Sequence, residues 1–229
     1  MLDLPVDGLP LELDGLRIAH LSDFHLGPPS RGAAAVRKAI AWVRERNPDF
    51  VVVTGDLLSK QSGRAALDEL LAGLDAYAVP GNHDVRATRD PFSRSGDLAG
   101  LPATLLLDDS RSVDVRGERV QIAGVAPRPG APVPEPDDAA GLRILLSHYP
   151  RLRADGYQLV LAGHMHAGQI VLPYPGGKLR LAHLRARLNE GVYRERGVTM
   201  HVSPGLGTTF VPFRFFARPE VTELVLHRA

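Results

Sequence analysis

Apolar and polar positions follow one another along the first eighty residues in the order expected of an α/β protein. Three short apolar runs, at Arg17–Leu21, Phe50–Val53 and Ala76–Val79, predict strands, and the unbroken second run is typical of a strand buried on both faces. Between these runs, apolar residues recur at helical spacing over Ala33–Arg46 and again over Leu67–Leu74. The pattern therefore predicts a βαβαβ unit with a largely parallel sheet.

The rest of the chain is richer in predicted strands. They are Leu11–Leu13, Thr104–Leu107, Arg111–Val115, Arg119–Gly124, Ile144–Leu146, Leu159–Leu161, Thr199–Val202 and Val221–Leu226. The segment Ala126–Pro136 contains five prolines and has the composition of a linker between domains. We interpret it as a stiff surface loop, because candidate site residues lie on both sides of it and must converge. The chain is therefore predicted to form a single domain over residues 1–229.

The composition restricts the possible functions and kinds of site more than it restricts the possible folds. The 229 residues include 27 Lys and Arg against 26 Asp and Glu, so the net charge gives no sign of a nucleic-acid-binding protein. The chain has nine His and no Cys, which excludes disulfides, thiolate nucleophiles and Cys-ligated zinc. Residues 1–7 carry no basic segment, and no run approaches the ~20 apolar residues that span a bilayer. We therefore expect a cytoplasmic protein.

Five short polar clusters lie where predicted strands end. They are Asp23-Phe24-His25, Gly55-Asp56, Gly81-Asn82-His83-Asp84, Ser147-His148-Tyr149-Pro150 and Gly163-His164-Met165-His166. Open α/β sheets place their ligand site at the carboxyl ends of the strands, so all five clusters can meet. In Asp-x-His and His-x-His, side chains two residues apart point to the same side of an extended chain. Carboxylate, imidazole and one amide oxygen suit Mn²⁺, Fe or Zn²⁺.

In order and spacing, these clusters resemble the calcineurin-like metallophosphoesterase superfamily, whose motifs are D-x-H, G-D, G-N-H-D/E, H and G-H-x-H. The resemblance covers roughly residues 16–170. Downstream, residues 202–208, 212–214 and 218–221 look like a bacterial branch that includes small phosphodiesterases and pyrophosphatases of lipid-linked sugar nucleotides. The resemblance implies a four-layer α/β sandwich, in which two mixed β-sheets pack face to face and helices flank them.

The resemblance also implies a dinuclear metal centre. One divalent ion would be held by Asp23, His25, Asp56 and His166. The second would be held by Asp56, Asn82, His148 and His164, so that Asp56 bridges the two. Mn²⁺ is the favoured metal, with Fe or Zn²⁺ as alternatives. Two such ions can share a hydroxide that attacks phosphorus, and can clamp the attacking and leaving oxygens.

His83 matches the family's non-ligand histidine, which binds a phosphoryl oxygen or protonates the leaving group. Asp84 would then orient the imidazole, although it could equally cap a helix that begins near Val85. Met165, Ala167 and Tyr149 depart from the residues usual in the branch, and this puts the shape of the substrate site in doubt rather than metal binding. The four remaining histidines are interpreted as surface or satisfied core residues: His20, His183, His201 and His227.

The sequence thus predicts a metal-dependent hydrolase of phosphoesters, with a diester or pyrophosphate favoured and a lipid- or nucleotide-linked substrate as a further expectation. A phosphomonoesterase, including a protein phosphatase, would use the same ligands. A non-catalytic metal-binding scaffold of the same fold is the alternative from another class. It predicts lost ligands, and none is lost. A nuclease is disfavoured by the near-zero net charge.

Two stretches of the second half leave alternatives open. Residues 178–196 carry six basic side chains against two acidic ones, namely Lys178, Arg180, Arg185, Arg187, Arg194 and Arg196 against Glu190 and Glu195. We interpret this stretch as a solvated face, and the alternative is a patch that attracts anionic substrates or acidic lipid headgroups. Four of the seven Phe lie within Phe210–Phe216. Core packing of the last strand is the favoured interpretation, and an exposed lip in peripheral contact with a membrane is the alternative.

Overall fold

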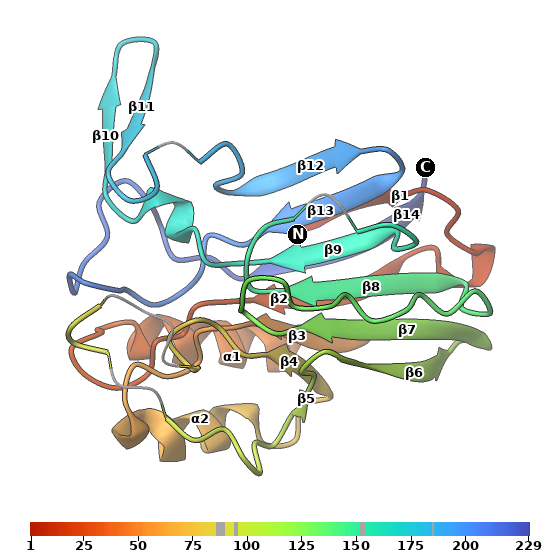
Figure 1. Ribbon diagram of the computed structural model, residues 1–229, viewed down its shortest axis with the longest axis horizontal. Coiled ribbons are helices and arrows are strands. Elements are labelled where there is room, and N and C mark those ends of the chain that lie inside the picture. The colour runs from red at the N-terminus through yellow and green to blue at the C-terminus, as the bar shows by residue number, and fades with distance from the viewer. Residues whose placement is uncertain (86–89, 94–95, 152–153, 185) are drawn as a thin grey trace.

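The computed structural model describes residues 1–85, 90–93, 96–151, 154–184 and 186–229. Most of its strands belong to two six-stranded sheets (Figure 1). The first sheet has the strand order β1-β14-β2-β3-β4-β5. Its strands are β1 (Leu2–Val6), β2 (Leu16–Leu21), β3 (Phe50–Thr54), β4 (Ala76–Val79), β5 (Thr104–Leu105) and β14 (Thr222–Arg228). Strands β2 to β5 run parallel, whereas β14 is antiparallel to β2, so the sheet is mixed.

The second sheet is also mixed. Its strand order is β12-β13-β9-β8-β7-β6. Its strands are β6 (Asp109–Val115), β7 (Glu118–Val125), β8 (Leu142–Ser147), β9 (Leu159–Ala162), β12 (Gly191–Glu195) and β13 (Val198–Val202). The central strands β7, β8, β9 and β13 are parallel, and the two edge strands are antiparallel to their neighbours.

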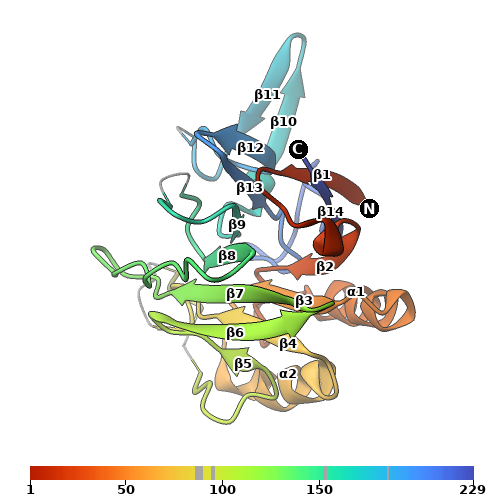
Figure 2. The ribbon, with the colours of Figure 1, turned by 90° about the vertical axis from the view of Figure 1, so that its right-hand side faces the viewer.

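The two sheets pack face to face over one apolar core, as Figure 2 shows. The packing of strand β3 explains why its sequence is an unbroken apolar run. Val52 packs into the core between the sheets, while Val51 and Val53 pack on the opposite face against the helices. Both faces of this strand are therefore buried, which removes the alternation seen in half-exposed strands.

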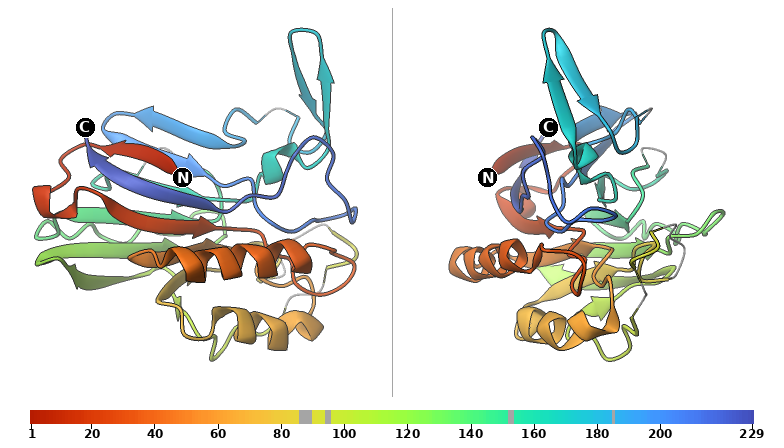
Figure 3. Two further views of the ribbon diagram at one scale, coloured as in Figure 1. Left: turned by 180° about the vertical axis from the view of Figure 1, so that it is seen from behind. Right: turned by 90° about the vertical axis from the view of Figure 1, so that its left-hand side faces the viewer.

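The helices α1 (Ala33–Arg46) and α2 (Arg64–Leu71) cover the outer face of the first sheet (Figure 3, left). Val36, Ile40 and Val43 point inward from α1, at the spacing that predicted the helix. The outer face of the second sheet is covered by loop residues such as Ala131 and Tyr157. Neither helix of the described chain has the length and hydropathy that crossing a membrane requires. The predicted α/β class with two mixed sheets is confirmed.

Several local predictions are confirmed and others are wrong. The helix over 33–46 and the strand over 76–79 have the predicted bounds. Leu11–Leu13 forms a 3-10 turn rather than a strand, because the Leu13 N–H donates to the Pro10 carbonyl. Strands β1 and β12 and the hairpin of β10 (Val171–Tyr174) and β11 (Gly177–Arg180) were not predicted. Strand β1 pairs with β14 from the other end of the chain, and a local pattern cannot show such a partner.

A buried carboxylate joins β14 to β2 and α1. Glu223 accepts hydrogen bonds from Arg17 Nε (2.7 Å) and Arg46 Nη2 (2.6 Å). Burial alone would raise the pKa of Glu223, but the hydrogen bonds from Arg46 and Arg17 outweigh it and hold the pKa below its usual range. The carboxylate thus stabilises the fold in its ionised form.

We expect Glu223→Gln to lower the free energy of unfolding by about 2 kcal/mol near neutral pH, because the charge-assisted hydrogen bonds that Glu223 accepts from Arg17 and Arg46 weaken. The folded-state pKa lies below the unfolded one, so this contribution is present above the usual Glu value of 4.5 and is lost as the pH falls through the folded pKa. Thermal unfolding of both proteins at pH 7 and at pH values below 4 measures this. A difference that is constant across this range would contradict the prediction.

Candidate metal centre

The candidate ligands lie at the carboxyl ends of parallel strands in both sheets. Asp23 and His25 follow β2, Asp56 follows β3, Asn82 follows β4, His148 follows β8, and His164 and His166 follow β9. The loops after these strands gather at one end of the sandwich (Figure 1). Residues more than 140 positions apart in the sequence are therefore neighbours there, for example His25 and His166.

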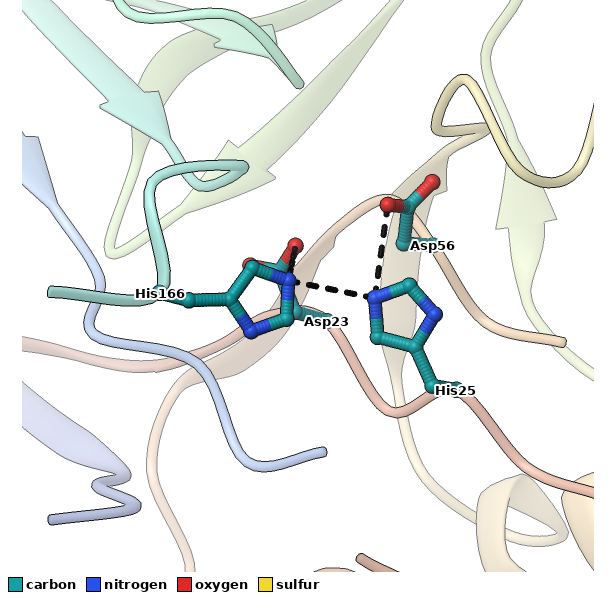
Figure 4. A group of neighbouring side chains, drawn as sticks. All are labelled: Asp23, His25, Asp56 and His166. Atoms are coloured by element: carbon teal, nitrogen blue, oxygen red, sulfur yellow. Dashed lines mark hydrogen bonds and ion pairs between the residues drawn. The ribbon is translucent and has the colours of Figure 1, made fainter. Parts of the chain in front are cut away.

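Four side chains form a first buried group, namely Asp23, His25, Asp56 and His166, which point toward one another in Figure 4. One ligand atom from each lies within 4.8 Å of the others. His25 Nε2 is 3.4 Å from Asp56 Oδ2 and 3.2 Å from His166 Nε2. His166 Nε2 is in turn 3.4 Å from Asp23 Oδ1. Two carboxylates and two imidazoles thus face one small volume.

Asp56, His148 and His164 form a second group that meets the same distance criterion. His148 Nε2 lies 3.4 Å from Asp56 Oδ2 and 3.1 Å from His164 Nδ1. Asn82 Oδ1 is 3.0 Å from the same His148 nitrogen. The ring of His148 is held by its Nδ1, which is 2.8 Å from the Thr54 carbonyl. All seven candidate ligands are thus brought together, and Asp56 belongs to both groups.

The donor set fits divalent cations. Asp23 Oδ1 is buried and has no hydrogen-bond partner among the residues that the structure describes. A buried carboxylate oxygen without a donor costs roughly 1–3 kcal/mol, and a cation beside it would remove that cost. Burial lowers the pKa of His25 to about 3, and burial together with His25 and Arg214 lowers that of His166. Both rings are neutral and offer lone pairs, as metal ligation requires.

The candidate ligands differ in how far their pKa values are shifted and in which direction. Burial alone would raise the pKa of Asp56, but His148 and His25 outweigh it, so Asp56 is ionised. Burial lowers the pKa of His148, yet the charges of Asp56 and Asp23 raise it to about 9. Burial raises the pKa of Asp23 to about 6. Asp56 is therefore the principal fixed negative charge at the point where the two groups meet.

The backbone at the site is strained. Five of the seven candidate ligands have left-handed φ values: Asp23 (55°), His25 (47°), Asp56 (53°), His164 (72°) and His166 (49°). Residues other than Gly rarely adopt this conformation, and they keep it where the surrounding structure enforces it. Here the Asp23 N–H donates to the Gly55 carbonyl and the His25 N–H donates to the Asp56 carbonyl, both over 2.9 Å. The loops after β2 and β3 thus hold one another in place.

Glycines beside the ligands are required by close contact. A Cβ at Gly81 would lie 2.0 Å from Asp56 Oδ1, and one at Gly163 would lie 1.9 Å from Ser22 Oγ. Any side chain at Gly81 would therefore displace the shared carboxylate.

The carboxylate of Asp84 is hydrogen-bonded to backbone groups of two loops. It accepts hydrogen bonds from the backbone N–H groups of Leu57 (3.1 Å), Leu58 (3.0 Å) and Gly81 (2.8 Å). A buried carboxylate that satisfies three backbone donors fixes the loop after β3 against the turn after β4. Burial, together with the charge of Asp56, raises the pKa of Asp84 to about 7.

His83 is oriented by residues that the sequence did not indicate. Its Nδ1 lies 2.9 Å from Ser93 Oγ, and its Nε2 lies 3.4 Å from Thr209 Oγ1. The same Nε2 is 3.9 Å from Asp56 Oδ2, so the imidazole faces the shared carboxylate. Burial lowers the pKa of His83, and Asp56 and Asp90 oppose that effect.

Arg214 is a second residue whose place in the site was not predicted. Its guanidinium donates to the carbonyls of Gly207 (2.8 Å), Pro204 (2.9 Å) and His166 (3.2 Å). The buried cation therefore holds the loop after β13 against the loop that carries His166. A further contact joins Arg214 Nη2 to His166 Nδ1 over 3.1 Å. The sequence offers no local signal for this role, because three of the acceptors are backbone carbonyls and the imidazole lies 48 positions away.

The other histidines largely follow the expected interpretation. His20 and His201 are buried and face one another, with their Nδ1 atoms 2.7 Å apart, and His20 Nε2 lies 2.9 Å from Thr54 Oγ1. His227 is a surface residue 3.2 Å from Asp3. His183 is exposed, and its ring lies against that of His164, with centroids 4.9 Å apart.

For residues 178–196 the structure favours the interpretation preferred from the sequence, whereas for Phe210–Phe216 it does not. In the basic stretch, Arg180 pairs with Glu190 and Arg194 pairs with Asp7, which favours a solvated face; Arg185 lies outside the described residues. Core packing of the Phe stretch is wrong. The side chains there are 43–65% exposed and precede β14, as found for Phe210, Phe213, Phe215 and Phe216.

A buried cluster of histidines and carboxylates at the strand ends of an α/β sandwich is the kind of site that metallohydrolases use. A family model described as calcineurin-like phosphoesterase matches residues 16–168. The chain therefore belongs to the calcineurin-like phosphoesterase family, and the resemblance seen in its motifs is confirmed.

Individual relatives agree with this assignment. A zebrafish (Danio rerio) protein named "Transmembrane protein with metallophosphoesterase domain" is 33% identical over 99% of this chain, which spans only 56% of that protein. "Phosphodiesterase YaeI" of Escherichia coli is 28% identical over 92% of this chain and 82% of its own length. The structure of Haemophilus influenzae NAD nucleotidase has a similar fold, with a TM-score of 0.51 at 14% identity over 85% of this chain and 48% of that one.

Proposed function

We propose that the protein hydrolyses phosphodiesters or pyrophosphates with the help of two divalent metal ions. The observation that carries the proposal is the position of Asp56 Oδ2, which lies 3.4 Å from both His25 Nε2 and His148 Nε2. A single carboxylate oxygen thus faces both groups of candidate ligands, as a bridging ligand would. The E. coli relative named a phosphodiesterase supports a diester over a monoester.

The first ion would be held by Asp23, His25, Asp56 and His166, and the second by Asp56, Asn82, His148 and His164. Mn²⁺ is the favoured metal, and Fe and Zn²⁺ suit the same nitrogen and oxygen donors. Bound ions of this kind lower the pKa of an attacking water and neutralise charge on the phosphoryl oxygens.

The protein's own side chains supply a general acid, His83, and the contacts that hold it in position. His83 Nε2 faces Asp56 Oδ2 from 3.9 Å and can carry a proton toward a phosphoester bound there. Ser93 and Thr209 hold the imidazole at its two nitrogens. Asp84 and Arg214 hold the loops around it through backbone groups. The acid and the candidate ligands are therefore positioned before any substrate binds.

The test is hydrolysis of bis-p-nitrophenyl phosphate and p-nitrophenyl phosphate by protein loaded with Mn²⁺, before and after treatment with a chelator. We expect faster turnover of the diester, loss of activity on chelation and recovery on reloading. Activity that survives chelation would overturn the proposal. Faster monoester turnover would establish a phosphomonoesterase instead, and at most one bound ion without activity would establish a scaffold.

We also propose peripheral membrane contact through Phe210–Phe216, which would bring the site to a lipid-linked substrate. This segment is paired with the projecting hairpin of β10 and β11, since the Val171 N–H donates to the Phe215 carbonyl. The hairpin adds exposed apolar side chains at the cross-strand pair Leu172 and Leu179, and an exposed Lys178 next to Leu179 in the chain. Exposed aromatic residues beside basic ones suit an anionic membrane surface.

The double variant Phe213→Ser and Phe215→Ser is expected to lose co-sedimentation with anionic phospholipid vesicles, because two exposed aromatic rings no longer insert. Leu107→Ser, which changes a similarly exposed apolar residue near β5, is the matched control and should bind as the unaltered protein does. No binding by the unaltered protein, or unchanged binding by the double variant, would rule out this contact.

A further inference from the structure

A pocket of about 410 Å³ opens directly beside the candidate metal centre. His166 belongs to both, since its ring faces Asp23 and His25 and the residue also lines the pocket. The opposite walls are mainly apolar and are formed by Ile170, Leu181, Ala182, Phe210 and Val211. Its size falls within the range of roughly 300–1,000 Å³ common for small-molecule sites.

The walls of the pocket are tied to one another. The Gln169 amide accepts from the Thr209 N–H (2.9 Å) and donates to the carbonyls of Thr209 (2.8 Å) and Val211 (3.1 Å). On the other side, the Leu181 N–H donates to the Ile170 carbonyl over 2.9 Å. The pocket is therefore formed by the segments that flank the β10–β11 hairpin and by the loop before β14, which these hydrogen bonds hold together.

Two polar side chains of the lining, Gln169 and Thr209, are already hydrogen-bonded within the protein, and His183 lies at the exposed edge. Both ends of the Gln169 amide are bound to backbone, and the Thr209 hydroxyl donates to Asp90 over 3.0 Å. A nucleobase or sugar in this pocket would find few partners for its own polar groups, and unpaired polar groups are costly to bury. The lining instead suits a hydrocarbon chain.

We propose that this pocket binds the alkyl or acyl chain of a phosphodiester whose phosphorus reacts at the candidate metal centre. The inference rests on the proposed function. In the reaction, a water oxygen bonds to phosphorus and the bond from phosphorus to the other ester oxygen breaks. That oxygen leaves with a proton, while the chain in the pocket stays attached to the phosphate product.

The test uses alkyl p-nitrophenyl phosphodiesters with methyl, butyl and octyl chains and the Mn²⁺-loaded protein. Burial of each methylene is worth about a 4-fold increase in kcat/KM while the chain still fits. We expect the octyl ester to exceed the methyl ester by at least about 100-fold. Equal kcat/KM along the series would overturn the inference and leave the proposed function standing, whereas no hydrolysis of any member would refute the proposed function itself.

Two variants locate the effect. Ala182→Phe fills the pocket and Val211→Ser makes its wall polar, so both should reduce the octyl-to-methyl ratio of kcat/KM toward one. Leu11→Ser, an exposed apolar position in the turn before β2, is the matched control and should keep the ratio of the unaltered protein. Ratios that both pocket variants leave unchanged would overturn the assignment.

Binding without turnover supplies an independent measurement on the unaltered protein. In titration calorimetry, octylphosphonate should bind more tightly than methylphosphonate and with a more negative heat-capacity change, because it buries apolar surface. Identical affinities and heat-capacity changes for the two phosphonates would count against the pocket even if the variants failed to fold.

Discussion

Asp56→Asn is expected to reduce hydrolysis of bis-p-nitrophenyl phosphate by about 1,000-fold or more. The amide has nearly the shape of the carboxylate, and its oxygen can still accept the hydrogen bond that Asp56 Oδ1 receives from the His83 N–H over 2.9 Å. The variant therefore keeps the fold but loses the ionised group that both sets of ligands share. Loss of several kcal/mol of metal-dependent stabilisation in the transition state corresponds to a rate effect of this order.

Metal content distinguishes this outcome from a general loss of activity. Elemental analysis should find two ions per chain in the unaltered protein and at most one in the variant. Asp155→Asn, which changes an exposed carboxylate in the connection between β8 and β9, is the matched control and should retain both ions and full turnover. Full metal content together with full activity in Asp56→Asn would exclude a bridging role.

His83→Ala is expected to reduce kcat by about 100- to 10,000-fold, the range typical of removing a general acid, while the metal content stays unchanged. The loss should depend on the leaving group. Esters of p-nitrophenol leave readily without a proton, whereas esters of less acidic phenols need one. In a series of methyl aryl phosphates, the loss should therefore grow as the leaving phenol becomes less acidic.

Two neighbouring variants separate protonation from positioning. Ser93→Ala removes the partner of His83 Nδ1 and should reproduce a smaller part of the leaving-group dependence. Asp84→Asn weakens three backbone contacts, so it should lower the temperature of unfolding without altering that dependence. A uniform loss for all leaving groups in His83→Ala would instead assign the imidazole to binding a phosphoryl oxygen.

The sequence predicts those parts of the fold that depend on local pattern. The spacing of Val36, Ile40 and Val43 defines α1, and the unbroken run in β3 reflects burial on both faces. The candidate ligands could be identified because they follow parallel strands, and the ends of such strands meet whatever the intervening loops contain.

The rest depends on partners that are distant in the sequence. The Thr209 hydroxyl lies 126 residues from His83, and Asp84 binds backbone N–H groups, which carry no residue-specific signal. The Phe stretch has the composition of a core strand. In the described part of the chain it makes a single isolated bridge, from Phe215 to Ile170, and joins none of the sheets, so its rings stay exposed. Local composition therefore gave the wrong environment for that segment.

The left-handed backbone at the candidate ligands has a consequence for how the chain can change. Each such residue lowers the free energy of unfolding by roughly 1–2 kcal/mol through backbone strain, which Gly at the same position would avoid. Mutagenesis that selects only for heat resistance, in the presence of a chelator, would therefore favour Gly at His164, which is left-handed but only partly buried, so that little packing is lost. A substitution that raises stability at such a position would also remove a candidate metal ligand, and with it the activity.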